Sequence, residues 1–423
     1  MDALSIEGGY PLQGSIRTAG AKNAALPLMA ASILNENKIC LSDVPYLSDI
    51  KTMQELLNNL GAEITDEGDN YFCITNKKIK SHIAPYEIVK KMRASAIIMG
   101  GLLAREGRAE LSLPGGCAIG ARPINFHLEA FKQMGAEIEL EAGYVIATAK
   151  NGLKGTIITF PQVSVGATEN VLIASVLAEG ETIIRNAAIE PEIDDLAKML
   201  NKMGAKISGI GTRELEIKGV TSLKPSSYTV IPDRIEAASY MIAAAMTEGE
   251  IKVENINPDI LRSTLDILKK IGVGIKTDSK NKTITAYRKS KFKPNDVVTE
   301  VYPGFPTDMQ AQITALLCLA DGKSHMVETI FENRFMHIPE LRRMGGNIDI
   351  SGNRLTIKGI EKFQPAEVMA TDLRASVSLV LAALNADGKS KIDRVYHLDR
   401  GYENIEQKLN KCGAKIRRIK ESP

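Results

Sequence analysis

The chain carries no tryptophan, few cysteines and almost no net charge. Its 423 residues include 53 lysines and arginines against 51 aspartates and glutamates, a formal charge of +2. Proteins that bind nucleic acid or membrane surfaces through bulk electrostatics need a strong basic excess, so the sequence argues against both kinds of partner. Any positive charge that serves a function must therefore be concentrated locally.

Long apolar runs and leader segments are also lacking. No apolar run approaches the roughly 18 residues that span a bilayer, and the first residues lack the basic and apolar regions of a signal peptide. The most apolar stretch, residues 377–384, is expected to be a buried helix or strand. We therefore expect a soluble, cytoplasmic protein.

Common cofactor and catalytic motifs are absent. The sequence contains no GxGxxG, Walker A, GxSxG or HExxH pattern, and its five histidines show no metal-ligand spacing. We therefore expect neither a cofactor nor a metal. The five cysteines are odd in number and lack a CxxC pair, which argues against a disulfide framework and a zinc module. Four of them fall in strand or helix patterns and are expected to be core thiols: Cys40, Cys73, Cys318 and Cys412.

What the sequence does contain is a sixfold repeat. The signature apolar-Gly-x-x-Ile follows a helix-like stretch six times and accounts for the whole chain. Each glycine is expected to end a helix in the left-handed conformation, so that a strand leaves at once. The six glycines are Gly61, Gly135, Gly204, Gly272, Gly345 and Gly413.

Each period predicts a βαβαββ unit with two different helices. Residues 193–200 have the apolar spacing of an amphipathic helix, whereas residues 235–246 are apolar nearly throughout. Because a helix of the second kind has no polar face, we expect it to be buried on every side. The fold class is therefore α/β.

The two ends of the chain indicate how the repeats are grouped. The sixth repeat lacks its closing strands, and residues 4–8 resemble the closing segments 215–219 and 355–359. The N-terminal strands are therefore expected to complete the C-terminal repeat. This grouping predicts two three-repeat domains, residues 22–231 and residues 1–21 plus 232–423. The two crossing connections would form a hinge, with a ligand in the cleft between the domains.

Cations occur where the apolar helices begin. Lys22, Arg93 and Arg374 lie at three of these N-termini, where a positive charge opposes the helix dipole unless an anion is bound. The other charged or hydroxylated residues there are explained as ordinary N-caps; they are Ser164, Asp233, Thr307 and Asp372.

A second slot, between a strand and the amphipathic helix, carries arginine in three repeats and not in the others. These residues are Arg122, Arg334 and Arg400. Each alone could be a surface arginine. Together with Lys22 and Arg374 they indicate a pocket for a small molecule with several negative charges, held by bidentate guanidinium contacts.

The second repeat also contains the one cysteine outside a core pattern. Cys117 follows Pro114-Gly115-Gly116 in a glycine-rich loop near Arg122. Nearby arginines favour the thiolate, whereas a bound polyanion favours the thiol. Cys117 is therefore a candidate nucleophile or acid, depending on whether the site is filled.

Longer motifs give the chain a family resemblance over essentially its full length. They run from residue 21 to 27, 114 to 123, 305 to 310, 331 to 337, 370 to 376 and 399 to 403. With these motifs the chain resembles the UDP-N-acetylglucosamine 1-carboxyvinyltransferases, a family of bacterial enolpyruvyl transferases. The resemblance implies two inside-out α/β barrel domains of three repeats each, with the apolar helices inside.

The resemblance also implies a reaction and its substrates. The enolpyruvyl group of phosphoenolpyruvate would pass to the 3-hydroxyl of UDP-N-acetylglucosamine with release of phosphate, in peptidoglycan precursor synthesis. Lys22, Arg122 and Arg400 would hold the phosphate, and Arg334 and Arg374 would help to neutralise phosphoenolpyruvate. Asp308 would be the base at the sugar hydroxyl and Cys117 the acid at C3. Alkylation of Cys117 by fosfomycin is expected as well.

The nucleotide sugar would contact a further set of residues. By the resemblance, these are Asn23, Arg93, Arg122, Pro123, Ile124, Asn125, Phe126, Gln162, Val163, Ser164, Val165, Gly166 and Ile330. The family often has Asp in place of Asn125 and Lys in place of Gln162.

Three other functions remain open from sequence. The related 3-phosphoshikimate transferase shares the fold and phosphoenolpyruvate but lacks the Pro-Gly-Gly-Cys loop. A catalytically silent paralogue could bind a nucleotide sugar as a regulator, although no site residue is missing. RNA 3′-phosphate cyclisation uses similar repeats, but the near-neutral charge and the histidine context argue against it.

Overall fold

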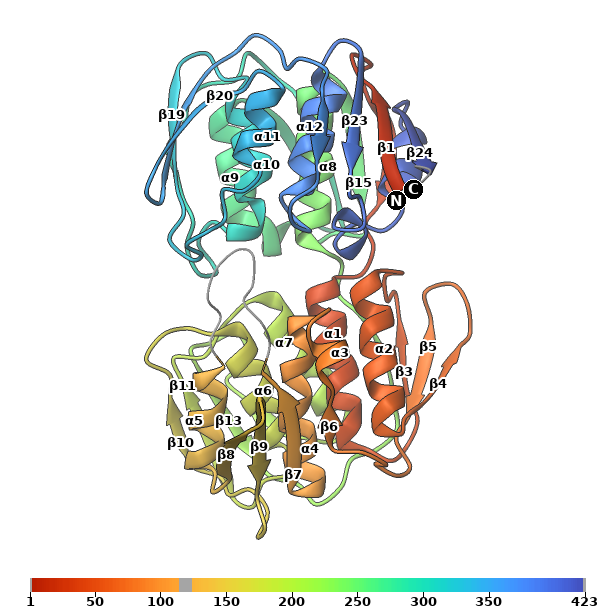
Figure 1. The fold of residues 1–423 in the computed structure, drawn as a ribbon, viewed down its shortest axis with the longest axis vertical. Coiled ribbons are helices and arrows are strands. Elements are labelled where there is room, and N and C mark those ends of the chain that lie inside the picture. Colours follow the sequence, from red (N-terminus) through yellow and green to blue (C-terminus); the bar gives the residue numbers. More distant parts are fainter. Residues whose placement is uncertain (1, 114–123, 421–423) are drawn as a thin grey trace. The chain divides into compact units, whose positions relative to one another are not determined.

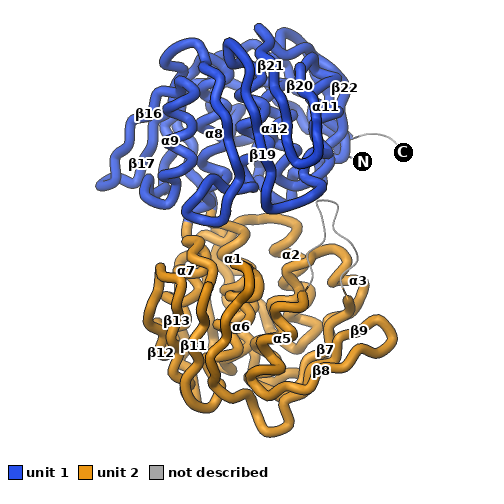
Figure 2. Tube along the Cα trace, turned by 90° about the vertical axis from the view of Figure 1, so that its left-hand side faces the viewer, with its two compact units in different colours: residues 1–19, 117–121, 232–423 blue, residues 20–116, 122–231 orange. Residues whose placement is uncertain are grey.

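The computed structural model describes residues 2–113 and 124–420. These residues divide into two compact units, residues 2–19 with 232–420 and residues 20–113 with 124–231 (Figure 2). Each unit has its own hydrophobic core.

The unit of residues 20–231 is an α/β assembly of three repeats. Its helices are α1 (Lys22–Ala31), α2 (Ser48–Leu60), α3 (Tyr86–Val89), α4 (Ile98–Glu106), α5 (Asn125–Gln133), α6 (Val165–Ser175) and α7 (Pro191–Met203). Its strands are β3 (Ile39–Ser42), β4 (Glu63–Asp66), β5 (Phe72–Thr75), β6 (Ile83–Ala84), β7 (Arg108–Ser112), β8 (Glu137–Glu141), β9 (Tyr144–Thr148), β10 (Ile157–Thr159), β11 (Glu181–Arg185), β12 (Lys206–Ser208), β13 (Glu214–Lys218) and β14 (Ser226–Thr229).

The other unit repeats the same plan. Its helices are α8 (Arg234–Met246), α9 (Arg262–Ile271), α10 (Gln310–Leu317), α11 (Ile338–Arg343), α12 (Ser376–Asn385) and α13 (Ile405–Asn410). Its strands are β1 (Asp2–Glu7), β2 (Gln13–Arg17), β15 (Glu250–Glu254), β16 (Val273–Asp278), β17 (Thr283–Arg288), β18 (Val297–Val298), β19 (Lys323–Val327), β20 (Asn347–Ser351), β21 (Arg354–Lys358), β22 (Glu367–Met369), β23 (Lys389–Asp393) and β24 (Lys415–Lys420).

The apolar helices are buried, as their sequences predict. Every residue of α8, α10 and α12 is buried, and these three helices contact one another. In the other unit α4 packs against both α1 and α6. Figure 1 shows the buried helices of each unit side by side, with sheets beside them. The amphipathic helices α2, α7 and α9 each end at a left-handed glycine, and all six repeat glycines have positive φ.

Within the described ranges the strands form six four-stranded sheets of one pattern. In four of these sheets the strand before an apolar helix pairs in parallel with the strand after it. In the other two, β14 pairs in parallel with β3, and β2 with β15. An antiparallel pair completes each sheet. The orders are β14-β3-β5-β4, β6-β7-β9-β8, β10-β11-β13-β12, β2-β15-β17-β16, β18-β19-β21-β20 and β22-β23-β1-β24. Each of these sheets is open, and the inside-out barrel stays a prediction.

The N-terminal strands complete two repeats, not one. β1 lies between β23 and β24, with Ile6 opposite Ser390 and Ile416, which confirms that this strand closes the sixth repeat. β2 instead pairs with β15 and completes the fourth repeat. The first repeat takes its missing strand from β14, which pairs with β3. The expectation was therefore right for β1 and wrong for β2.

Two cysteines differ from their expected state. Cys40 and Cys73 form a disulfide, because they face each other across β3 and β5 with their Cα atoms 4.0 Å apart. The spacing of the cysteines in the chain gave no sign of this pairing, which depends on strand register. Cys318 and Cys412 are buried free thiols, as expected.

Candidate active site

An aspartate with two arginines forms the centre of the candidate site in the unit of residues 232–420. Asp308 lies in a short 3-10 turn (Thr307–Met309) ahead of α10. Its Oδ1 accepts a hydrogen bond from Arg334 Nη2 at 2.7 Å, and its Oδ2 lies 3.7 Å from Arg374 Nε. Asp308, Arg334 and Arg374 thus come together from segments far apart in the sequence. We call these three residues the Asp308 cluster.

Arg374 is held in a fully buried position. Its Nη2 donates to Asp233 Oδ2 at 2.9 Å and its Nη1 to the carbonyl of Gly401 at 3.0 Å, while its guanidinium lies over the ring of Tyr402. Burial opposes the charge, but Asp233 and Asp308 outweigh it and raise the pKa of Arg374. Its Nε has no hydrogen-bond partner among the described residues, so it is available to a further acceptor.

Arg400 belongs to a segment that touches this cluster. It ends the 3-10 turn Leu398–Arg400, directly before Gly401, whose carbonyl binds Arg374. The neighbouring Asp399 accepts two hydrogen bonds from Arg418 at 2.7 and 2.9 Å, and Arg418 also donates to Glu406 at 2.8 Å. Arg418 therefore ties β24, α13 and the Arg400 turn together. Three of the predicted cations lie in one region of this unit.

Lys22 and Asn23 lie at the start of α1 in the other unit. Lys22 is buried, and its Nζ donates to Asp49 Oδ2 on α2 at 3.0 Å. The positive charge of Lys22 opposes the α1 dipole, and the Asp49 carboxylate lies beside it. Asn23 is half-buried next to this ion pair. The salt bridge to Asp49 limits the conformations that the Lys22 side chain can adopt.

Three of the segments predicted to contact the nucleotide sugar lie close to His127. This histidine on α5 is buried, and its Nδ1 lies 2.9 Å from Asn170 Nδ2 on α6. Burial, followed by the charge of nearby Arg93, lowers the pKa of His127 to about 4. A side chain at Gly166 would meet the imidazole at 3.3 Å. Arg93, the start of α5 and the start of α6 are therefore neighbours.

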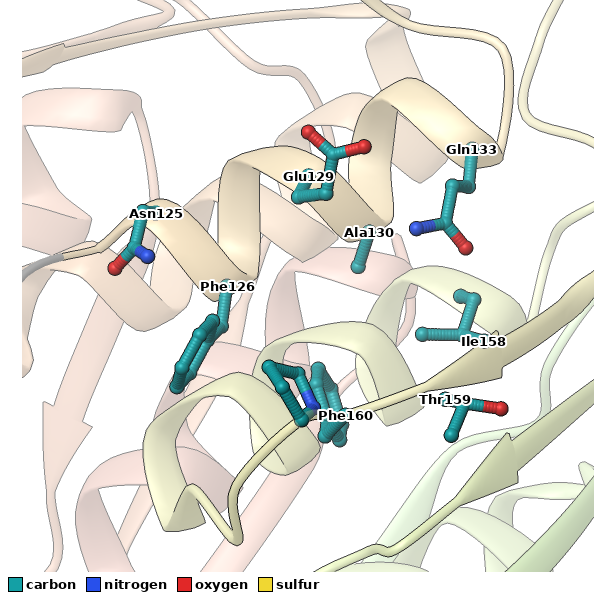
Figure 3. A pocket seen from close by; sticks show the side chains of 9 residues that line it. Asn125, Phe126, Glu129, Ala130, Gln133, Ile158, Thr159 and Phe160 are labelled. Carbon is teal, nitrogen blue, oxygen red and sulfur yellow. The ribbon is translucent and has the colours of Figure 1, made fainter.

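A pocket of about 240 Å³ opens beside the same elements (Figure 3). Asn125 and Phe126 line it from α5, and Phe160 and Pro161 line it from the end of β10. Phe126 lies near Phe160 in this view. The predicted segment 162–166 follows Pro161 directly; Gln162 is exposed, Val163 to Gly166 are half-buried, and Ser164 caps α6 as expected.

Some predicted residues lie elsewhere or outside the description. Cys117, Arg122 and Pro123 are outside the described residues. Ile124 is buried directly ahead of α5. Ile330 lies in the other unit, half-buried after β19.

Sequence reasoning missed three carboxylates and misassigned one hydroxyl. Asp233 was expected only to cap α8, which it does through Oδ1, but its Oδ2 holds Arg374. Asp49 and Glu328 were not singled out. Thr307 was expected to be an N-cap, but it makes no capping bond and its hydroxyl binds Glu328.

The architecture and this charged cluster define the class of protein. The family model described as EPSP synthase (3-phosphoshikimate 1-carboxyvinyltransferase) matches residues 6–409. The crystal structure of the enolpyruvyl transferase NikO from Streptomyces tendae superimposes with a TM-score of 0.89 at 25% sequence identity, covering 99% of this chain and 98% of that one. The fold is thus the two-domain α/β fold of the enolpyruvyl transferases.

Relatives with higher sequence identity indicate which family of enolpyruvyl transferases the chain belongs to. A UDP-N-acetylglucosamine 1-carboxyvinyltransferase from Paramagnetospirillum magneticum is 51% identical, covering 100% of this chain and 99% of its own length. One from Endomicrobium trichonymphae is 52% identical, covering 99% of this chain and all of its own. The chain belongs to the UDP-N-acetylglucosamine 1-carboxyvinyltransferase family and is a transferase. Among the described residues no helix is long and apolar enough to cross a membrane.

Proposed function

We propose that the protein transfers the enolpyruvyl group of phosphoenolpyruvate to the 3-hydroxyl of UDP-N-acetylglucosamine and releases phosphate. The observation that carries the proposal is the Asp308 cluster, in which one carboxylate lies against two buried guanidinium groups. A base next to two cations suits an anionic substrate whose partner must lose a proton. The names of the relatives support these substrates.

The chemistry divides into addition and elimination. In the addition, the sugar oxygen forms a bond to C2 of phosphoenolpyruvate, its proton passes to Asp308, and C3 gains a proton from the Cys117 thiol. In the elimination, C3 returns a proton to the Cys117 thiolate while the C2–O bond to phosphate breaks. Asp308 gives up its proton as phosphate leaves. Both groups return to their starting state, as a catalyst must.

The arginines serve both steps. Arg334 and Arg374 can donate hydrogen bonds to an anionic substrate and stabilise the negative charge that develops in the addition and in the departure of phosphate. Lys22, Arg122 and Arg400 would hold the phosphate in place for departure. We further propose that the nucleotide occupies the pocket of Figure 3 and the adjoining 162–166 segment, and that fosfomycin alkylates Cys117.

The proposed substrates also suggest where the enzyme works. Both carry several negative charges and do not cross a bilayer unaided, so we propose that the enzyme acts in the cytoplasm. There its product would feed peptidoglycan precursor synthesis.

Two substitutions test the assignment of acid and base. Cys117→Ala should lose most phosphate release and keep its affinity for UDP-N-acetylglucosamine, because the thiol acts on C3. Asp308→Asn should lower kcat by about 100-fold or more, since general base catalysis is typically worth about 10²–10⁴. Turnover of Cys117→Ala equal to that of the wild type would remove the thiol from the mechanism. A wild-type kcat in Asp308→Asn would remove the base.

A further inference from the structure

Glu328 is a buried carboxylate at which three segments of one unit meet. It follows β19 directly and is 2% exposed. Its Oε1 accepts hydrogen bonds from Thr299 Oγ1 at 3.0 Å and from the backbone N–H groups of Ile330 and Phe331 at 2.8 and 3.1 Å. Its Oε2 accepts one from Thr307 Oγ1 at 2.8 Å. Glu328 therefore joins the Ile330 segment to the turn that carries Asp308.

The hydrogen bond between Thr307 and Glu328 determines how the Thr307 hydroxyl can interact with Arg334. The single hydroxyl proton of Thr307 is donated to Glu328 Oε2. The lone pairs of Thr307 Oγ1 are then left to accept, and Arg334 Nη1 donates to this oxygen at 2.8 Å. The other end of the same guanidinium, Nη2, donates to Asp308. Glu328, Thr307, Arg334 and Asp308 are thus joined by consecutive hydrogen bonds, with Arg334 donating to Thr307 on one side and to Asp308 on the other.

The fold alone does not call for a glutamate here. In four of the six repeats the residue directly after the equivalent strand has a positive φ and makes the turn itself: Asp43, Asn186, Asn255 and Arg394. Glu328 occupies this position in the fifth repeat without adopting that conformation. Glu328 therefore shares neither the turn conformation nor its role with those four residues, so the turn does not account for a buried glutamate in the repeat that carries Asp308 and Arg334.

We infer that Glu328 is a positioning residue for the proposed reaction. Through Thr307 it sets the orientation of the Arg334 guanidinium, and through the N–H of Ile330 it holds the segment predicted to meet the nucleotide sugar. It does not touch the reacting atoms itself. This inference rests on the proposed function for its substrates, but the hydrogen-bond chain that carries it is a separate observation.

The test uses a double-mutant cycle. Glu328→Gln keeps the shape but offers one acceptor oxygen instead of two, so Thr307 Oγ1 and the amide compete to donate. Thr307→Val removes the relay, and Thr307→Ser keeps the hydroxyl. Glu361→Gln, at an exposed glutamate of the same unit, is the control. Steady-state kinetics of phosphate release with both substrates and thermal unfolding are measured for each.

The inference predicts a specific pattern. Glu328→Gln and Thr307→Val should each raise the KM for phosphoenolpyruvate about tenfold or more, whereas Thr307→Ser and Glu361→Gln stay within about threefold of the wild type. In the double variant Glu328→Gln/Thr307→Val the losses should not multiply, because both act on one chain of contacts. Activity should fall in the single variants even where the melting temperature is retained.

Other outcomes separate the two claims. The positioning role would be overturned if the activity losses of the two single variants multiplied in the double variant, or if Glu328→Gln had wild-type kinetics. Either result would leave the proposed function intact. If Glu328→Gln does not fold, the comparison of Thr307→Val with Thr307→Ser tests the positioning role instead. Equal activity of these two variants would overturn that role. A wild-type enzyme without turnover on these substrates would overturn the proposed function and, with it, the role assigned to Glu328.

Discussion

At the scale of single residues, the strongest constraint on the candidate site is the buried pair of Asp233 and Arg374. Both side chains are almost fully buried, and their atoms lie 2.9 Å apart. A buried charge is tolerated only with its partner, so removal of one member leaves the other uncompensated. The pair therefore holds Arg374 beside Asp308. Loss of either member should lower the stability of the protein.

We predict that Arg374→Met destabilises the protein by about 3–5 kcal/mol, as is typical for a broken buried pair. Asp233→Asn/Arg374→Met should be less destabilised than the sum of the two single variants, since asparagine still caps α8 and no lone charge remains. Urea unfolding of the four proteins measures this. Additive losses would show that the pair is not coupled.

Two buried histidines set a pH dependence of stability. Burial lowers the pKa of both His127 and His337 to about 4, with the charges of Arg93 and Arg334 adding to the effect. The unfolded chain binds these protons near pH 6.5, so below that value it holds more protons than the folded state. Stability is therefore full above pH 6.5 and falls as the pH drops towards 4.

His127→Asn should reduce this acid sensitivity. One proton corresponds to about 1.4 kcal/mol per pH unit, and asparagine binds none. The difference in unfolding free energy between pH 7 and pH 5 should therefore be smaller in the variant than in the wild type, by urea titration at each pH. An unchanged difference would mean that His127 is protonated in the folded protein.

At this scale the sequence predicts the cationic residues of the candidate site, but not the carboxylates that they contact. Arginines in Asp308's unit were identified because they depart from the repeat pattern, and the structure brings Arg334 and Arg374 onto one carboxylate. Asp233, Asp49 and Glu328 look like caps or surface acids in sequence, because their role depends on which distant side chain they meet. The Cys40–Cys73 disulfide was missed for the same reason.

At the scale of elements, close approach of strand ends to the buried helices explains a glycine shared by the repeats. Added side chains at Gly8, Gly219 and Gly359 would meet the carbonyls of Ala383, Ala178 and Ala320 at 2.1, 1.7 and 1.9 Å. Those carbonyls lie at or just after the C-terminal ends of α12, α6 and α10. The equivalence of residues 4–8 with the closing segments, inferred from sequence, thus has a steric basis.

Gly8→Ala should therefore be strongly destabilising, by about 3 kcal/mol or more, because backbone atoms must shift to admit the methyl group. Gly352→Ala is the matched control: it has open space around it and a positive φ of 58°, so it should lose only about 1–2 kcal/mol. Chemical denaturation compares the two. Equal losses would contradict the close packing of Gly8 on α12.

At the scale of the whole molecule, the two units differ in how the chain builds them. Residues 20–113 and 124–231 supply all the described strands of their unit, whereas the other unit needs β1 and β2 from the far N-terminus. The crossings are anchored on both sides: Asp233 N donates to the carbonyl of Ala19, and Ala21 N donates to the carbonyl of Ile231. The sixfold repeat is visible in the sequence, but the exchange of β2 and β14 between repeats is not, because strand pairing depends on contacts between segments far apart in the chain.

Fragments of the chain test this difference. Residues 20–231 expressed alone should fold cooperatively, as they include a complete core. Residues 232–423 alone should not, since β1 is a buried inner strand of its sheet. Circular dichroism with urea titration distinguishes the two. Cooperative unfolding of the second fragment by itself would contradict the assigned topology.

The central claim concerns the acceptor of the enolpyruvyl group, and phosphate release from phosphoenolpyruvate tests it most directly. The intact protein is offered UDP-N-acetylglucosamine, shikimate 3-phosphate or RNA ends in turn, with each rate compared to the rate without acceptor. We predict that phosphate is released from phosphoenolpyruvate only when UDP-N-acetylglucosamine is the acceptor. Release only with shikimate 3-phosphate, or with none of the three, would contradict the account.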